Sequence, residues 1–331
     1  MPPAGRRNIS KTTILLIILT PVFVYILTMP FRDHFQSLLN KAEQAMGDHN
    51  QGYSAANPPP IPTASKPRPL GAAPSGTPYW TPNLQAPSVE TNFRHETGQH
   101  GWGNAESQNY VSSPANSFHH NSTLIVRAII DSSLPSPSEQ YTSARLTSHA
   151  TLARPRGCLT AHITAPIATG IWPAFWLLPA DPFIWPTDGE VDIFEAWDGD
   201  AINHSCLHWG FFNGEDWNKH RVLETPLNTI TTTGQRFDFV WDERQDGSGR
   251  LIWYIDGRAV MKAEKPRGTR RMSEFRILIN IAVGGNVCKG HMPRNGAYEM
   301  TIRDLAMWES GPGGWEGFDR DWRSAKEGHG M

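Results

Sequence analysis

Three carboxylates lie close together in the segment "TDGEVDIFEAWDGD": Glu190, Asp192 and Glu195. In a strand, residues two apart share a face, so Glu190 and Asp192 point to one side and a regular strand turns Glu195 to the other, apolar side. An unpaired carboxylate on that side is costly. A β-bulge around Ile193 or Phe194 would return Glu195 to the shared face, and bulges are common beside active sites. The spacing therefore predicts a bulged strand that presents all three acids together.

The chemistry open to this group follows from its geometry. Four strand steps separate the backbones of Glu190 and Glu195 by roughly 13 Å. Inward-reaching side chains bring the carboxyl groups towards about 5 to 5.5 Å, the separation of nucleophile and acid/base in a retaining glycosidase. Asp192 between them can keep their pKa values apart. The alternative is a solvated strand face whose acids bind nothing. Trp172 and Trp176 just upstream favour a sugar site, although packing in the core is the other interpretation of each.

The elements that must position these residues read as β-structure. From about residue 77 to 308, short runs with period-two alternation are separated by turn residues, and helix signals are scarce. The segment "WDERQDGSGRLIWYIDG" predicts a hairpin, because Asp246-Gly247 and Ser248-Gly249 supply the positive-φ residues of a tight turn. No strand alternates with a helix of crossover length, which disfavours a parallel α/β fold. The pattern predicts an all-β sandwich or barrel.

Composition indicates one folded domain and excludes one class of partner. The chain has 331 residues, of which 39% are hydrophobic, and its net charge is -2. Its basic residues form no stripe that could follow a phosphate backbone, so nucleic acid is not an expected partner. Thirteen tryptophans with many Gly and Pro are typical of a loop-rich β protein that displays aromatic surface. The Gly-rich, charged tail, residues 309–331, is predicted to be peripheral or disordered.

The N-terminus predicts a membrane anchor. Residues 12–31 carry no charge and are numerous enough to cross a bilayer of about 30 Å. Basic residues at positions 6, 7 and 11 hold residues 1–11 in the cytosol, which gives a single-pass type II protein whose folded domain is extracellular or lumenal. The Pro-rich residues 32–76 read as a stalk. The alternative is a long signal peptide that is removed, leaving a secreted protein.

Cysteines and sequons add weaker expectations. Cys158, Cys206 and Cys288 lie far apart, so the sequence offers neither metal-ligand spacing nor a redox motif. An oxidising compartment allows one disulfide, whose pairing cannot be deduced from the sequence. The sequons at Asn121 and Asn203 predict glycosylation at both asparagines.

The motifs together resemble a known family. "WPAFWLLP" followed by "GEVDIFEAW" resembles glycoside hydrolase family 16, in its endo-1,3-β-glucanase (laminarinase) and endo-1,3(4)-β-glucanase branch. "GWGNAESQNY", "YTSARL", "CLHWG" and "NIAVGGN" are similar to further segments of that branch, in the same order, from about residue 79 to 308. The resemblance implies a β-jelly roll sandwich of two antiparallel sheets with a glucan cleft across the concave face.

The resemblance also implies roles for individual residues. Glu190 is the nucleophile that forms a covalent glycosyl-enzyme, Glu195 is the acid and then the base, and Asp192 assists. The implied cleft residues are Asn104, Arg145, Trp172, Trp176, His208 and Asn286. A core or turn role is the alternative for Asn104 and His208. The chain departs from the branch at Val287, where laminarinases commonly have Trp, so substrate preference is less secure than reaction type.

The predicted function is therefore a retaining endo-β-glucanase that hydrolyses 1,3- or mixed 1,3(4)-β-glucan outside the membrane, in cell-wall glucan remodelling. Its expected partner is the β-glucan polysaccharide, and we expect a monomer. No cofactor is required, and although the family accommodates a structural calcium ion, the sequence shows no ligand set for one. The alternatives are a glucan transglycosylase with the same acids and a non-catalytic β-glucan-binding protein, a form that usually lacks the glutamates.

Overall fold

The computed structural model describes residues 71–211 and 219–330. The chain divides into two units, Met1–Arg68 and Pro69–Met331, and the described residues all belong to the second. The predicted cytosolic segment, the predicted anchor at residues 12–31 and nearly all of the predicted stalk lie outside the described residues. Within residues 71–211 and 219–330, no helix is long and apolar enough to cross a membrane.

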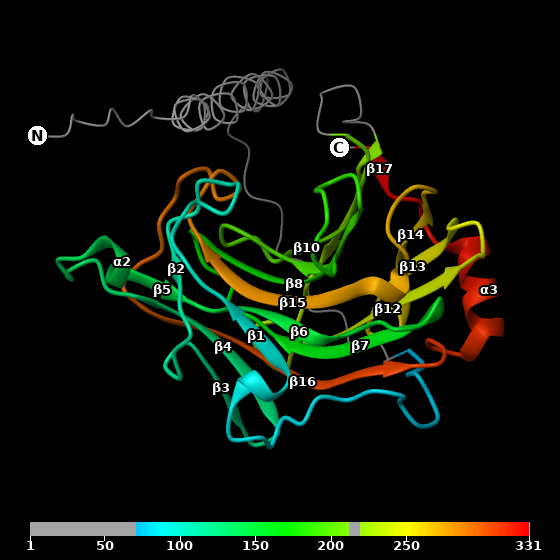
Figure 1. Cartoon of the computed structure of the whole chain (residues 1–331), viewed down its shortest axis with the longest axis horizontal. Coiled ribbons are helices and arrows are strands. Elements are labelled where there is room, and N and C mark those ends of the chain that lie inside the picture. The colour runs from blue at the N-terminus through cyan, green and yellow to red at the C-terminus, as the bar shows by residue number, and fades with distance from the viewer. Residues whose placement is uncertain (1–70, 212–218, 331) are drawn as a thin grey trace, which may run out of the picture. The chain divides into compact units, whose positions relative to one another are not determined.

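The described residues form two stacked sheets (Figure 1). The eight-stranded sheet has the order β1 (Phe93–Glu96), β6 (Arg145–Thr151), β15 (Phe275–Val283), β8 (Ile171–Pro179), β9 (Glu190–Glu195), β10 (Ile202–His208), β11 (Arg221–Pro226) and β17 (His329–Gly330). The nine-stranded sheet has the order β14 (Arg258–Lys265), β13 (Gly249–Ile255), β12 (Gln235–Glu243), β7 (Arg156–Thr164), β16 (Gly296–Trp308), β4 (Thr123–Ile130), β5 (Tyr141–Ser143) and β2 (Asn109–Tyr110), with β3 (Ser117–His120) paired to β4. Short helices connect them: η1 (Val89–Thr91), α2 (Pro137–Gln140) and η3 (Met272–Glu274).

The core between the sheets confirms the all-β sandwich predicted from alternation. On β8, Ile171, Phe175 and Leu177 are buried in this core, whereas Trp172 and Trp176 alternate with them and are only half-buried. Every strand pair is antiparallel except β2 with β5. The predicted hairpin is β12 with β13, and it turns at residues 244–248. Alternation therefore assigns one face of the eight-stranded sheet to the core and leaves the other for the polar residues.

The predicted bulge is present in β9. Asp192 pairs with Trp176 of β8 and Phe194 pairs with Phe175, so Ile193 is the extra residue. Both Ile193 and Phe194 are buried in the core. The bulge therefore shifts the alternation by one residue, and Glu195 returns to the face of Glu190 and Asp192.

Residues 309–330 lie at the periphery of the domain, which is one of the two predicted alternatives, but they are ordered, which contradicts the other. Residues Gly314–Ser324 form helix α3, which lies beside β13 (Figure 1), and His329–Gly330 form β17, which pairs with β11. Trp315, Phe318 and Trp322 recur at helical spacing and pack on the outer side of the nine-stranded sheet. The tail is therefore part of the fold, because one aromatic face of α3 buries apolar surface against the sheet. The Gly-rich, charged composition of the tail does not indicate this face.

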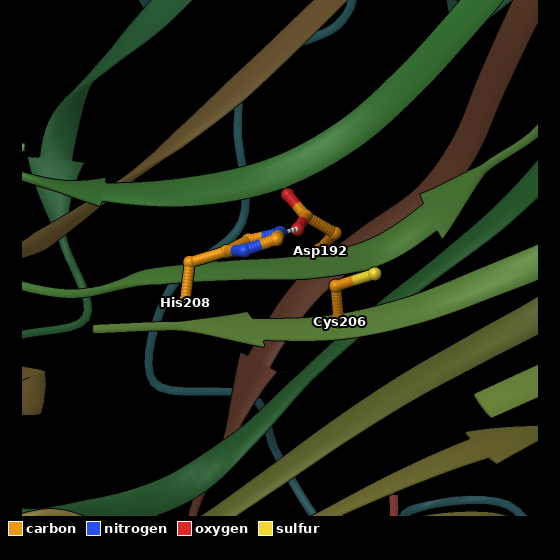
Figure 2. A group of neighbouring side chains, drawn as sticks. All are labelled: Asp192, Cys206 and His208. Carbon is orange, nitrogen blue, oxygen red and sulfur yellow. Dashed lines mark ion pairs between the residues drawn. The ribbon is translucent and has the colours of Figure 1, made fainter. Parts of the chain in front are cut away.

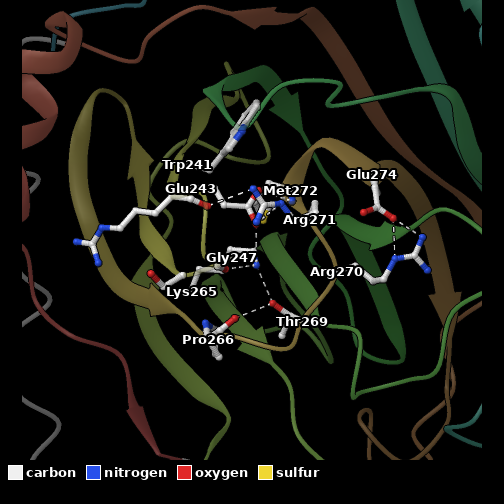
Figure 3. A network of polar contacts seen from close by, with 12 residues as sticks. Trp241, Glu243, Gly247, Lys265, Pro266, Thr269, Arg270, Arg271, Met272 and Glu274 are labelled. Carbon is white, nitrogen blue, oxygen red and sulfur yellow. Dashed lines mark hydrogen bonds and ion pairs between the residues drawn. The ribbon is translucent and has the colours of Figure 1, made fainter.

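A buried ion pair connects the hairpin to the segment after β14 (Figure 3). The Glu243 side chain is 0% exposed, and Lys265 Nζ lies 3.0 Å from its Oε1. The same Nζ donates hydrogen bonds to Gly247 O and Thr269 Oγ1. Segment 266–271 then reaches the loop before β9, where Arg270 N donates to Asp188 O at 2.9 Å. This network therefore supports the loop that leads into Glu190.

Helix α3 yields a stability prediction. Phe318 is 1% exposed, so Phe318→Ala removes a buried ring and should lower the free energy of unfolding by about 3 kcal/mol. Thermal or urea unfolding measures this change. Arg323→Ala, at an exposed position of the same helix, is the matched control and should leave the midpoint nearly unchanged. Equal midpoints for the two variants would show that α3 contributes nothing to the folded domain.

Candidate active site

The three acids lie on the sheet face that points away from the core. Glu190 of β9 is directly opposite His208 of β10, and Asp192 is opposite Cys206. On the other side of β9, Asp192 is opposite Trp176 of β8. Side chains of directly opposed residues lie on one face, so the strand register alone gathers these groups around the acids.

Glu190 and Asp192 share one histidine neighbour, His208. His208 Nε2 lies 3.2 Å from Asp192 Oδ2 and 4.0 Å from Glu190 Oε1. Trp185, in the loop before β9, donates its Nε1 hydrogen to Glu190 Oε2 at 2.9 Å. The three side chains of Glu190, Asp192 and His208 are 14%, 5% and 16% exposed, so these charges interact in a poorly solvated site.

Glu195 is held by different groups. Trp172 Nε1 donates to Glu195 Oε1 at 2.6 Å, and the backbone amide of Glu195 donates to Asn203 Oδ1 at 3.0 Å. Trp172 thus contacts an acid directly, as Trp185 does from the other side. Both tryptophans orient a carboxylate in addition to offering an aromatic face.

Asn203 secures the bulge, and the prediction that it carries a glycan is wrong. Its side chain is 0% exposed, accepts from the amide of Glu195 and donates to Ile193 O at 3.3 Å. Both backbone groups lie just past Asp192, where the pairing of β9 with β10 ends, so the Asn203 side chain of β10 takes the place of a strand partner there. A glycan cannot attach to this buried amide in the folded domain. Asn121 is exposed, so its glycosylation stays a prediction.

The surroundings give the two glutamates different acidity. Burial and the charge of Asp192 raise the pKa of Glu190, while His208, Trp185 and Arg145 counteract that rise. Burial, followed by the charges of Asp192 and Glu190, raises the pKa of Glu195 well above its usual value, while the hydrogen bond from Trp172 counteracts part of that rise. The net pKa of Glu190 rises to about 8, but groups beside it favour its ionised form, whereas the surroundings of Glu195 favour its protonated form. Burial lowers the pKa of His208, but Asp192 and Glu190 outweigh it and the net shift is upward.

Asp192, Cys206 and His208 form a cluster with potential metal ligands (Figure 2). Their donor atoms lie within 4.8 Å of one another. A metal requires a thiolate and a neutral imidazole. Burial raises the pKa of Cys206 well above its usual value, and the net pKa shift of His208 is upward, so the surroundings favour the protonated form of both residues. Calcium prefers oxygen ligands, which this cluster lacks apart from Asp192. The donor set therefore fits a proton-holding acid site better than a metal centre.

All three cysteines are buried and unpaired, so the disulfide that an oxidising compartment would allow does not form in this structure.

The remaining predicted residues flank the acids in two groups. Arg145 stacks 4.7 Å above the ring of Trp176, whose Nε1 donates to Asn280 Oδ1 at 2.7 Å. The loops of Asn104 and Asn286 are joined by a backbone hydrogen bond of 2.7 Å from Asn286 N to Asn104 O. Arg145 and Trp176 thus line the same face as the acids, whereas substrate contact by Asn104 and Asn286 stays a prediction.

Comparisons with known proteins now decide the family. The model described as "XgeA-like, catalytic GH16 domain" matches residues 101–238. A glucan endo-1,3-beta-glucosidase of Cryptopygus antarcticus is 30% identical over 235 residues, which cover 64% of this chain and 82% of that protein. The chain belongs to glycoside hydrolase family 16. The family predicted from the motifs is therefore confirmed.

Other relatives of this family 16 chain differ in length and in the function that their names give. Glucan endo-1,3-beta-glucosidase A1 of Niallia circulans is 25% identical over 254 residues, and the match covers 68% of this chain but only 36% of that protein. A beta-1,3-glucan-binding protein of Penaeus monodon is 26% identical over 257 residues, covering 58% of this chain and 70% of that protein. The laminarinase structure from Rhodothermus marinus superposes with a TM-score of 0.59 at 22% identity, over 71% of this chain and 98% of that one, and shares its fold.

Sequence reasoning missed three residues of this family 16 site. Trp185 precedes Glu190 by only five residues, and its position in the Pro-rich approach to the acids was the available signal. Asn203 was assigned to a sequon, and only the pairing of β9 with β10 shows what it bonds. Asn280 lies one strand further away, on β15, and its contact with Trp176 depends on sheet order alone.

The bulge yields a catalytic prediction. Asn203→Leu leaves the amide of Glu195 and the carbonyl of Ile193 unsatisfied, so Glu195 should move away from Glu190. We expect kcat on laminarin to fall about a hundredfold with little change in KM, because small displacements of an acid are costly. Ser205→Ala is the matched control, since Ser205 Oγ also accepts from Asn203 Nδ2 but bonds neither the amide of Glu195 nor the carbonyl of Ile193. Equal kcat values for Asn203→Leu and the wild type would contradict this role.

His208 yields a pH prediction. A nearby cation favours ionised Glu190 and lowers its pKa, so His208→Gln should raise that pKa. The acidic limb of the kcat/KM profile should then move to higher pH by about one unit. The exposed His149 provides the control His149→Gln, which should leave the limb in place. A limb that stays fixed or moves to lower pH in His208→Gln would show that His208 does not act on Glu190.

Proposed function

We propose that this chain is a retaining endo-β-glucanase that hydrolyses 1,3- or mixed 1,3(4)-β-glucan by double displacement. The observation that carries the proposal is the bulge at Ile193, because it turns Glu195 towards the face of Glu190. The names of the two glucan endo-1,3-beta-glucosidase relatives support the choice of substrate class. Since the chain spans about a third of the length of the Niallia circulans relative, that support extends to the domain and not to a whole protein.

In the first step, the Glu190 carboxylate attacks the anomeric carbon and forms an ester bond to it as the glycosidic C–O bond breaks. Glu195 gives its proton to the leaving oxygen. His208, Trp185 and Arg145 favour the ionised form that this role requires of Glu190, and burial with the charges of Asp192 and Glu190 favours the protonated form that it requires of Glu195. The half-buried Trp176 offers a ring on which a sugar can stack.

In the second step, the Glu195 carboxylate takes a proton from water, whose oxygen attacks the anomeric carbon. The bond to Glu190 breaks and the product leaves with the configuration of the substrate. Asp192 holds His208 at 3.2 Å throughout, which keeps a cation beside Glu190 when its charge returns. Trp185 donates to the Glu190 oxygen that is not facing His208 and limits its rotation.

A glucan transglycosylase would use the same first step with a sugar hydroxyl in place of water. A binding protein would use the face without chemistry. Retention of both glutamates, each with a donor of its own in Trp185 and Trp172, favours an enzyme over a binder. Hydrolysis is preferred over transfer because both endo-1,3-β-glucosidase relatives carry hydrolase names.

We also propose the cellular setting predicted from the sequence. The uncharged residues 12–31 support a single-pass type II anchor, with a secreted form after cleavage as the alternative. The folded domain would then act outside the membrane as a monomer, on cell-wall glucan. Fractionation of the full chain with and without residues 12–31 tests the anchor, and recovery of both forms in the carbonate-soluble fraction would exclude it.

Rescue of nucleophile and acid variants tests the mechanism. Glu190→Ala and Glu195→Ala in the full chain should each lose about a hundredfold or more in turnover of laminarin. Added azide occupies the space of the missing carboxylate, so Glu195→Ala should form a β-glycosyl azide and Glu190→Ala an α-glycosyl azide. Glu309→Ala, whose side chain is 74% exposed, is the control and should keep wild-type turnover.

The same assay separates the alternatives. Wild-type turnover in either glutamate variant would contradict the roles, and binding without turnover in the wild type would favour the binding protein. Products longer than the substrate, formed with added laminaribiose and without new reducing ends, would favour the transglycosylase.

A further inference from the structure

A second feature of the active-site face is a pocket of about 420 Å³ on the β1 side of the acids. Its floor is Leu178, two residues beyond Trp176 on β8, together with Leu278 of β15. Its walls come from β1, β6 and the loop that follows β8, and they carry charged residues. A pocket of this size accommodates a ligand of one to a few rings.

The two carboxylates of the pocket, Glu96 and Asp181, already pair with arginines. Glu96 accepts from Arg145 Nε at 2.8 Å and from Thr147 Oγ1 at 2.5 Å. Arg94 lies 3.4 Å from Glu96 and donates to Asp181 Oδ2 at 2.5 Å. Arg94 and Arg145 are therefore each compensated by a carboxylate within the protein.

The third guanidinium of the pocket, Arg276, is not compensated. Its Nη1 donates to Ser148 O at 3.0 Å, and its Nε is buried without a hydrogen-bond partner. Among the described residues, no carboxylate lies within 4.0 Å of this side chain. The pocket thus holds three guanidinium groups against two carboxylates, and a partly buried cation without a partner is costly.

A neutral sugar does not remove this imbalance, because hydroxyl groups carry no charge. A carboxylate, phosphate or sulfate does, since each matches the planar donors of a guanidinium. The pocket also joins the acid site directly, as Arg145 lines the pocket and stacks on Trp176. A polysaccharide lying across the acids would therefore enter the pocket within a few sugar units.

We propose that this pocket is a subsite for an acidic substituent carried by the bound glucan, with Arg276 as its counter-ion. The substrate class is then a β-glucan that bears carboxylate, phosphate or sulfate groups at intervals. The identity of the polymer rests on the proposed function, whereas the preference for an anion rests on the charges of the pocket. Arg276 determines specificity and takes no part in bond cleavage.

Binding to the full-length Glu190→Gln variant tests this proposal without turnover. The probes are laminaritetraose, the same oligosaccharide oxidised at C6 to a carboxylate, and one carrying a sulfate at C6, measured by calorimetry at low and at high salt. We expect the acidic probes to bind about tenfold more tightly than the neutral one at low salt, and less so at high salt. Comparing the carboxylate with the sulfate identifies which anion fits.

Substitutions at Arg276 test whether this residue causes the preference for the acidic probes. Arg276→Gln on the same background should reduce the acidic-to-neutral ratio to about one, and Arg276→Lys should keep part of it. Arg303→Gln removes a charge from the other sheet and should leave the ratio near tenfold. Any of three results would overturn the proposal. They are an acidic-to-neutral ratio of one before any change at Arg276, a tenfold ratio that survives Arg276→Gln, and no binding of any probe.

Turnover of neutral laminarin by the wild type separates this result from the proposed function. If laminarin is hydrolysed and the ratio is one, only the anion subsite fails. If the ratio is tenfold and laminarin is not hydrolysed, only the hydrolase function fails.

Discussion

Ile193 has no partner on β8, and its carbonyl and the amide of Glu195 are satisfied by the side chain of Asn203 on β10. This local defect lets Ile193 and Phe194 both enter the core while Glu195 turns back towards Glu190. Burial of the two apolar side chains supplies the driving force, and Asn203 removes the penalty of two unsatisfied backbone groups. The position of the acid thus depends on the packing of the core beneath it.

Electrostatic interactions then give the two glutamates, which are chemically identical, different roles. Both glutamates are buried enough for their pKa values to rise, but only Glu190 is near His208 and Arg145. Asp192 contributes to both effects, since its charge raises the pKa of each glutamate and it also retains the proton on His208. His208 and Arg145 favour the ionised form of Glu190, and this difference distinguishes the nucleophile from the acid in a site that excludes much of the water.

The same principle extends along the face to Arg276, where a charge has no partner within the protein. At the acids, the unequal surroundings of Glu190 and Glu195 serve the reaction. In the pocket, the uncompensated charge of Arg276 selects the ligand. The two regions are joined by Arg145, which pairs with Glu96 and stacks on Trp176, so a substituent in the pocket and a sugar at the acids are held by one connected set of side chains.

The sequence predicted the features that follow from local period. Alternation gave the all-β class, and the mismatch between Asp192 and Glu195 gave the bulge, because a misplaced carboxylate is a local conflict. The role of Asn203 and the lack of a carboxylate beside Arg276 depend on which strands become neighbours, and a single sequence does not specify sheet order. The C-terminal helix escaped prediction for another reason. Its Gly-rich, charged composition is typical of disorder, whereas only the helical spacing of Trp315, Phe318 and Trp322 indicates a helix.

The configuration of the first product tests most directly whether the bulge brings Glu195 to Glu190. Proton NMR during the first minutes of laminarin hydrolysis resolves the new reducing-end anomers before they equilibrate. Two carboxyl groups close together predict retention, so the β-anomer should appear first and the α-anomer only as mutarotation proceeds. Initial appearance of the α-anomer would mean that the two acids are too far apart for a covalent intermediate, and it would contradict the account.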